Sequence, residues 1–254
     1  MKYASAFLTV IIMLALLAPV IAPYDSNTTH PEESLEAPNR TYLLGTDLLG
    51  RDVLSRVLIG GQRTLTISAL ATAFAAVLGT FVGMISGFAP DFVDRLLRVF
   101  INAALAIPGI ILALVVLTLT GRSAQAVAFA TGVALIAPFA QVIRAAVLSI
   151  RHESYIEAAI AAGANTSRVL LWHILPNIRV TLLAYTGVTF SYAMINSAAL
   201  SFLGLGGDLV DWGVLLADGR LVFQTAPWVS LAPGIIMSLT VMSVNHLTEQ
   251  FSQR

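Results

Sequence analysis

Residues 151–177 read RHESYIEAAIAAGANTSRVLLWHILPN, a polar, helix-forming segment between two long apolar stretches. Ala and Glu dominate residues 153–162 and favour a helix, and Gly163 gives the backbone the freedom to turn after it. The Asn-Thr pair at 165–166 can cap a second helix, which Pro176 ends because its ring and missing N–H prevent continuation. The segment is longer than a membrane protein needs to reverse direction, so it is either a solvated linker or a surface for a partner.

The composition is that of a membrane protein. The chain has 254 residues, of which 57% are hydrophobic and 11% charged, and its mean hydropathy is +0.84. Soluble domains carry about 25% charged residues, so these values predict an all-α polytopic membrane protein. The net charge is zero, which gives no support for binding to nucleic acid.

The residue types that catalysis needs are scarce. The chain has no cysteine, which excludes disulfides, thiolate catalysis and Cys-based metal sites. Its only lysine is Lys2, so it cannot form the Gly-Lys-Ser/Thr loop that holds nucleotide phosphates. The four histidines show no metal-ligand spacing, and the serines of the apolar segments have no nearby base in sequence. We therefore expect this chain to be no enzyme and to bind no metal or cofactor.

Six apolar segments are long enough to cross a membrane, since about 20 residues span the hydrocarbon core. They lie at about 3–22, 64–88, 97–120, 124–147, 180–203 and 228–247. A signal peptide is the alternative for the first, but its apolar core is usually about 7–15 residues, and Pro23 disfavours cleavage. We expect residues 1–63 to hold the first span, an external loop and an interfacial helix, and residues 64–254 to form a five-helix core.

Several details of these segments make structural predictions. Residues 47–61 can form an amphipathic helix at the membrane interface, capped by Thr46 or Asp47, or a surface helix that leads into the second span. Glycines recur every fourth residue in that span and favour close helix packing. Prolines interrupt three later spans and predict kinks. These two sets are Gly79, Gly83 and Gly87, and Pro108, Pro138 and Pro233.

Loop charge predicts the orientation. With the amino terminus inside, the inner face carries eight basic and five acidic residues, and the outer face carries six arginines and nine acidic residues. This bias follows the positive-inside rule, so both termini and the 151–177 loop are expected in the cytoplasm. The cores of the spans lack Asp, Glu, Lys and Arg, which argues against ion-coupled transport. Polar residues of the fifth span are candidates for a substrate route: Tyr192, Asn196 and Ser197.

Glu157-Ala158-Ala159, Gly163 and Ile174-Leu175-Pro176 resemble the EAA loop of the membrane subunits of bacterial ABC importers. In that family a helix of this loop, the coupling helix, docks into a cleft of the ATPase subunit. The resemblance implies that Glu157 pairs with a basic residue of the ATPase and that Gly163 tolerates little bulk. The implied ATPase-coupling residues are Tyr155, Glu157, Ala158, Ala159, Gly163 and Pro176.

Two more motifs are similar to the dipeptide, oligopeptide and nickel branch of that family. They are GTDLLGRDVLSR at 45–56, and SFLGLG at 201–206 followed by Trp212-Gly213. The resemblance implies that the outer loops meet a substrate-binding protein. The implied contact residues are Asp47, Arg51, Asp52, Asp208, Asp211 and Trp212.

The resemblance runs from about residue 23 to 245 with its motifs in matching order, and it implies a type I ABC importer permease in a bacterial or archaeal cytoplasmic (inner) membrane. Such a subunit moves peptides, nickel or metal chelates into the cytoplasm. Its expected partners are a second homologous permease, two ABC ATPases that bind ATP and Mg, and an extracellular or periplasmic substrate-binding protein. The alternative is a secondary transporter or channel that works alone, and solute flux through the isolated chain would distinguish the two.

Overall fold

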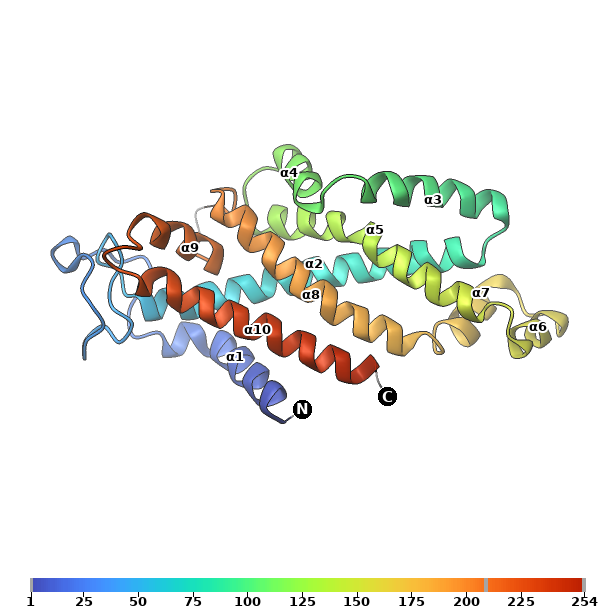
Figure 1. Ribbon diagram of the computed structural model, residues 1–254, viewed down its shortest axis with the longest axis horizontal. Helices are drawn as coiled ribbons and strands as arrows, with labels where there is room; N and C mark the ends of the chain where they lie inside the picture. The colour runs from blue at the N-terminus through green and yellow to red at the C-terminus, as the bar shows by residue number, and fades with distance from the viewer. Residues whose placement is uncertain (1, 208–209, 253–254) are drawn as a thin grey trace.

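A computed structural model describes residues 2–207 and 210–252, and this part of the chain is helical (Figure 1). The helices that belong to the spans are α1 (Lys2–Ile21), α2 (Val53–Phe88), α3 (Asp91–Leu105), α4 (Gly109–Thr120), α5 (Ala124–Ile150), α8 (Arg179–Phe202) and α10 (Trp228–Ser252). The shorter helices are η1 (Pro31–Glu33), α6 (Ser154–Ala161), α7 (Thr166–Arg168), η2 (Val169–Ile174) and α9 (Trp212–Leu221). Within these described ranges, four helices have the length and hydropathy to cross a membrane, and up to six spans result if each of two bent pairs counts as one.

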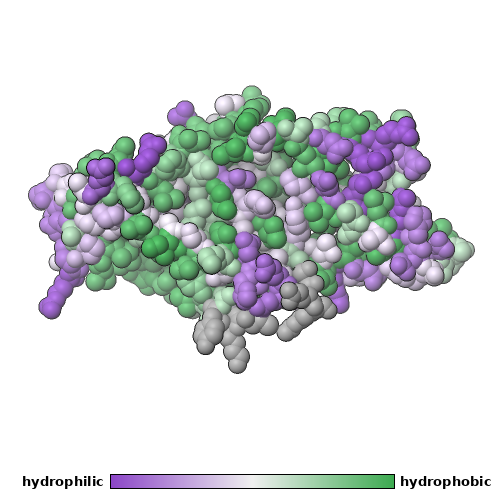
Figure 2. All heavy atoms as spheres, in the orientation of Figure 1, coloured by the Kyte–Doolittle hydropathy of each residue, from purple (hydrophilic) through white to green (hydrophobic). Residues whose placement is uncertain are grey.

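The long helices lie side by side along the long axis of the molecule (Figure 1). Residues 22–52 and α9 gather at one end and are called the external cap below, after the orientation that the loop charges predict. The segment that carries α6, α7 and η2 lies at the other end, and the ends of α1 and α10 that carry the termini point toward it. Hydrophobic residues dominate the middle of the surface and hydrophilic residues gather toward both ends (Figure 2), as expected of a protein that crosses a bilayer.

Helices α2 and α5 make the most extensive contact in the bundle, and Gly79, Gly83 and Gly87 of α2 lie in it. An ideal Cβ added to Gly79 would lie 2.6 Å from the Cβ of Phe139, and one on Gly87 would lie 2.7 Å from the Cβ of Val147. At Gly83 the nearest atom would be the carbonyl oxygen of Ala140, at 2.6 Å. The glycine face predicted from the sequence is confirmed, and its partner is α5.

The second span begins differently from the prediction. Of the helix expected at 47–61, residues 47–52 instead form a loop. Residues 53–61 are the first turns of α2, which starts at Val53 and leads into the second span, as the alternative to an interfacial helix predicts. Asp52 caps α2, since its side chain accepts a hydrogen bond from the backbone N–H of Ser55 at 2.8 Å. Helix α2 then continues without a break to Phe88, so its first turns belong to the same helix as the second span.

The third span is broken rather than kinked. Helices α3 and α4 differ in direction by 91°. Pro108 precedes the first residue of α4, and the residue before a proline is disfavoured in helical conformation. By contrast, α5 and α10 continue through Pro138 and Pro233. Of these three prolines, Pro108 alone lies at a break between two helices.

Candidate functional site: the coupling loop, the external cap and a cavity

The loop at 151–177, called the coupling loop from here on, folds as the two predicted helical segments. Helix α6 ends at Ala161, and Gly163 follows with a φ of +85°. The N–H of Gly163 donates to the carbonyl of Ile160 at 2.9 Å, and the N–H of Ala164 donates to that of Ala159 at 3.0 Å, which is the Schellman pattern of a glycine-terminated helix. Asn165 then caps α7 by accepting from the N–H of Arg168 at 2.8 Å.

The coupling loop rests on the bundle through buried apolar side chains. Ile156 of α6 is fully buried, as are Val169 and Ile174 of η2. They belong to one hydrophobic cluster with Ile143 and Val147 of α5, which also contains Met84 of α2. Displacement of α6 would therefore act directly on the ends of α5 and α2, since packed apolar contacts transmit movement.

The opposite side of the coupling loop is open. Glu157 and Ala158 are exposed, and Tyr155 and Trp172 are 42% and 76% exposed. Within the described residues, Glu157 has no side-chain hydrogen bond or ion pair. Ala159 is half-buried and Pro176 is exposed. The predicted coupling residues thus form an exposed surface of small, apolar and acidic side chains. The opposite side of the coupling loop is packed against the bundle.

Gly163 is constrained by its backbone and not by lack of space. A Cβ added there would meet nothing of this chain within 4 Å, so within the chain it is the positive φ that disfavours other residues. Replacing Gly163 with Val should still lower transport in the assembled importer, because β-branched residues at positive φ cost roughly 1–3 kcal/mol. Gly163→Asn is the matched control, since Asn adopts this conformation more readily. Equal transport rates for the two variants in proteoliposomes would show that this turn does not matter.

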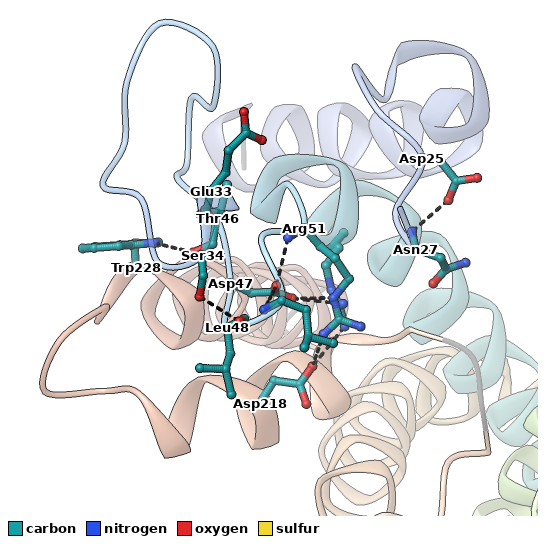
Figure 3. A network of polar contacts seen from close by, with 12 residues as sticks. Asp25, Asn27, Glu33, Ser34, Thr46, Asp47, Leu48, Arg51, Asp218 and Trp228 are labelled. Carbon is teal, nitrogen blue, oxygen red and sulfur yellow. Dashed lines mark hydrogen bonds and ion pairs between the residues drawn. The ribbon is translucent and has the colours of Figure 1, made fainter. Parts of the chain in front are cut away.

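The external cap is held by a network of two arginines and two aspartates (Figure 3). The Arg51 Nε lies 2.7 Å from Asp47 Oδ2 and its Nη2 lies 3.2 Å from Asp218 Oδ2. Arg56, from the first turn of α2, pairs with the same two carboxylates at 3.1 and 3.0 Å. The side chains of Asp47 and Arg56 are each only 2% exposed. The network ties the loop before α2 to α9.

A second set of contacts fixes the start of α9 against α2. Asp211 caps α9 by accepting from the N–H of Val214 at 2.9 Å and also accepts from the Ser201 hydroxyl at 2.6 Å. Burial raises the pKa of Asp211, and these hydrogen bonds partly oppose that rise. The Trp212 indole donates to the carbonyl of Val57 at 2.9 Å. A Cβ on Gly61 would come within 2.9 Å of that indole, so the glycine makes room for it.

Four of the residues that were expected to contact the binding protein are buried inside this chain. Asp47, Asp52, Asp211 and Trp212 are only 1–3% exposed, and their polar groups are used within the chain. Such side chains stabilise the external cap and present no surface to a partner, which corrects the expectation that they touch one. Arg51 remains partly exposed, with 18% of its side chain accessible. Asp208 lies outside the described residues.

A cavity of about 660 Å³ lies among α5, α8 and α10. Tyr192, one of the three predicted path residues, lines it and is 55% exposed. Asn196 and Ser197 are not among the lining residues, and the Ser197 hydroxyl donates to the Met194 carbonyl at 3.2 Å. The rest of the polar lining includes Ser191 and Asn245, which share a hydrogen bond of 2.9 Å, together with Thr181, Tyr185, Thr248 and Glu249.

Comparison with known proteins agrees with this geometry. Residues 79–254 match the family described as binding-protein-dependent transport system inner membrane component. Residues 3–38 match the N-terminal TM domain of oligopeptide transport permease C.

Curated relatives match over nearly the whole chain. A dipeptide transport system permease protein of Alkalihalophilus pseudofirmus is 33% identical, and the alignment covers 94% of this chain and 79% of the relative. A di/tripeptide transport system permease protein of Pseudomonas aeruginosa is 32% identical, with 94% and 82% covered. A glutathione transport system permease protein of Escherichia coli is 33% identical, with 96% and 82% covered.

Solved structures of low identity share the fold. An inward-facing MetNI methionine ABC transporter gives a TM-score of 0.64 at 20% identity and covers 78% of this chain and 96% of that one. An amino acid ABC transporter crystallised with histidines gives 0.62 at 18% identity, with 79% and 94% covered. The chain belongs to the family of binding-protein-dependent transport system inner membrane components, as a non-catalytic, multi-pass permease subunit of an ABC importer.

Proposed function

We propose that this permease carries peptides inward and that α6 is the element through which partner ATPases drive it. The observation that supports the proposal most directly is that one side of the coupling loop packs on the bundle while the other side is exposed. Its inner side is packed through Ile156 into the cluster of α2 and α5, and its outer side presents Glu157 and Ala158. A rigid element seated in a partner moves with that partner and displaces the helices attached to it.

The outer side of the coupling loop suits a protein partner. Ala158 and Ala159 allow the close approach of a partner backbone, and Glu157 offers an unpaired charge to a basic residue. A recess of about 430 Å³ lies nearby, lined by Ser167, Arg168, Leu171 and Trp172. Trp172 and Arg168 are of the residue types that are enriched among interface hot spots. We place the ATPase on this surface, with ATP and Mg bound by that subunit.

We also propose that both termini and the coupling loop lie in the cytoplasm, as the loop charges predict. The external cap then faces a substrate-binding protein. Because Asp47, Asp52, Asp211 and Trp212 are buried, we assign the contact to Arg51 and to two exposed apolar residues beside it. These are Leu48 and Leu49, which are 49% and 46% exposed. A second, homologous permease would complete the translocation path.

The cavity that Tyr192 lines would be one wall of that path. Its polar lining combines hydroxyl and amide groups, among them Ser191 and Asn245, with the carboxylate of Glu249, and these groups can hydrogen-bond to peptide groups. The relatives described above are named for dipeptides, di- and tripeptides and glutathione, all of which contain peptide-type amide bonds. Peptides are therefore the substrate class that we propose, and no observation favours nickel or a metal chelate over them.

Reconstitution tests this function. Proteoliposomes that contain both permeases and both ATPases should import a labelled peptide when ATP is inside and loaded binding protein outside. Removing the ATPases should abolish import. Flux of peptide through this chain without the ATPases would instead support a transporter or channel that works alone, and import of nickel in place of peptide would overturn the substrate class.

A further inference from the structure

A buried ion pair joins three helices at the end of the bundle that carries the coupling loop. The Arg144 Nε of α5 donates to Asp94 Oδ1 of α3 at 2.7 Å, and its Nη2 donates to Asp94 Oδ2 at 2.7 Å. The Ser86 hydroxyl of α2 donates to the same Oδ1 at 2.7 Å. Only 11% of the Asp94 side chain and 20% of the Arg144 side chain are exposed. These three residues form what we call the three-helix clamp.

The geometry of the clamp is directional. Two parallel N–H···O bonds between a guanidinium and a carboxylate fix orientation as well as distance. Arg98, one turn along α3, also approaches Asp94, with its Nε 3.2 Å from Oδ2, but it belongs to the same helix and is 47% exposed. The carboxylate is thus fully occupied by protein donors. Its role is to hold helices together and not to bind a substrate or carry a proton.

The clamp lies where movement of the coupling loop would enter the bundle. Arg144 is within the last two turns of α5, which ends at Ile150 just before α6. Its neighbours Ile143 and Val147 pack in the cluster that holds Ile156 of α6. A further contact nearby, from Arg151 Nη1 to the carbonyl of Gly87 at 3.3 Å, also joins the end of α5 to α2.

We propose that Asp94 is a positioning residue for energy coupling. By holding α2, α3 and α5 together, the clamp makes their ends move as one body with the coupling loop, so that ATPase movement displaces the helices and is not lost in local bending. This inference rests on the proposed function. It adds a specific requirement: without the clamp, ATP is hydrolysed but fewer peptides are imported for each ATP.

The first test measures peptides imported per ATP hydrolysed by the complete importer in proteoliposomes. Asp94→Asn should lower this ratio about two- to thirtyfold, the range seen when residues that carry coupling are changed. Ser86→Ala should lower it less, because the ion pair remains. Arg98→Gln is the matched control, since it removes a contact to Asp94 within α3, and its ratio should stay near that of the unchanged protein. An unchanged ratio in Asp94→Asn would overturn the inference.

The second test replaces the ion pair between Asp94 and Arg144 with a covalent link. Because the chain has no cysteine, an Asp94→Cys/Arg144→Cys variant carries the only two thiols, which a short bis-maleimide can join. The unlinked variant should resemble Asp94→Asn, and linking should recover peptides imported per ATP. If linking stops transport, α3 and α5 must separate during the cycle and the clamp is not one body.

Assembly of the complex shows whether the proposed function fails or only the role of the three-helix clamp. Each variant is first tested for co-purification with the ATPases and the second permease. If the unchanged chain does not assemble with the ATPases, the proposed function fails. If it assembles and transports but Asp94→Asn couples as well as the unchanged chain, only the role of the clamp fails. If the Asn variant does not fold, Ser86→Ala and the linked pair decide the question.

Discussion

Replacing Asp47 with alanine should destabilise the external cap by about 3 kcal/mol, the lower end of the cost of breaking a buried ion pair. The Asp47 carboxylate pairs with Arg51 and Arg56 and also accepts the N–H of Leu49 at 2.9 Å. Its loss leaves the buried Arg56 with Asp218 alone, which is 36% exposed. The lower end applies because the outer members of the network are partly solvated. Thermal unfolding of the purified chain in detergent measures the effect.

Asp25→Ala is the matched control for that substitution. Asp25 lies in the same segment and accepts a hydrogen bond from the N–H of Asn27 at 2.8 Å (Figure 3), but it is exposed. We expect its midpoint of unfolding to differ little from that of the unchanged chain. If Asp47→Ala proved as stable as Asp25→Ala, the network would not be what holds the cap.

Replacing Gly83 with leucine should prevent normal packing of α2 against α5. A Cβ at this position would lie 2.6 Å from the Ala140 carbonyl oxygen and 2.8 Å from the Ile143 Cβ, and the backbone cannot move aside as a flexible side chain can. Overpacking a core costs about 1–3 kcal/mol and sometimes more, and we expect at least the upper value here. The yield of folded protein after detergent extraction and its unfolding temperature should both fall.

Gly109→Leu provides the comparison for the leucine substitution. Gly109 begins α4, and an added Cβ there would meet only the Cβ of Ala134, at 4.0 Å. The same change in side chain is therefore expected to be tolerated. A Gly83 variant that folded as well as the Gly109 variant would contradict the packing that the structure gives to α2 and α5.

Features that depend on local sequence were predicted well. The capped turn at Gly163 and Asn165 follows from residue preferences that act over a few positions, and the glycine face of α2 follows from helical periodicity. The break at Pro108 was expected only as a kink, because its 91° bend depends on how α4 packs on α5 and not on the proline itself. Helix α9 was expected only as a loop, since its start depends on capping by Asp211 and on Trp212 reaching α2.

The sequence did not predict which residues of distant segments contact one another. Asp94 and Arg144 were counted only as charges of the inner face, although their bidentate pairing joins α3 to α5. Acidic residues before α2 and α9 were interpreted as surface contacts, whereas Asp47 and Asp211 are buried by partners far away in sequence. Charges near the ends of several spans were the available signal, but a single sequence does not show which of them pair.

We expect α6 to be seated in an ATPase on the cytoplasmic side, and a single thiol on α6 tests this most directly. Ala158 is exposed on α6, and because the chain has no cysteine, Ala158→Cys carries its only thiol. A short bifunctional reagent should link this thiol to the ATPase in assembled importer, and a membrane-impermeant maleimide added to intact cells should leave it unmodified. Labelling from outside the cell, or an assembled importer in which no link to the ATPase forms, would contradict the account.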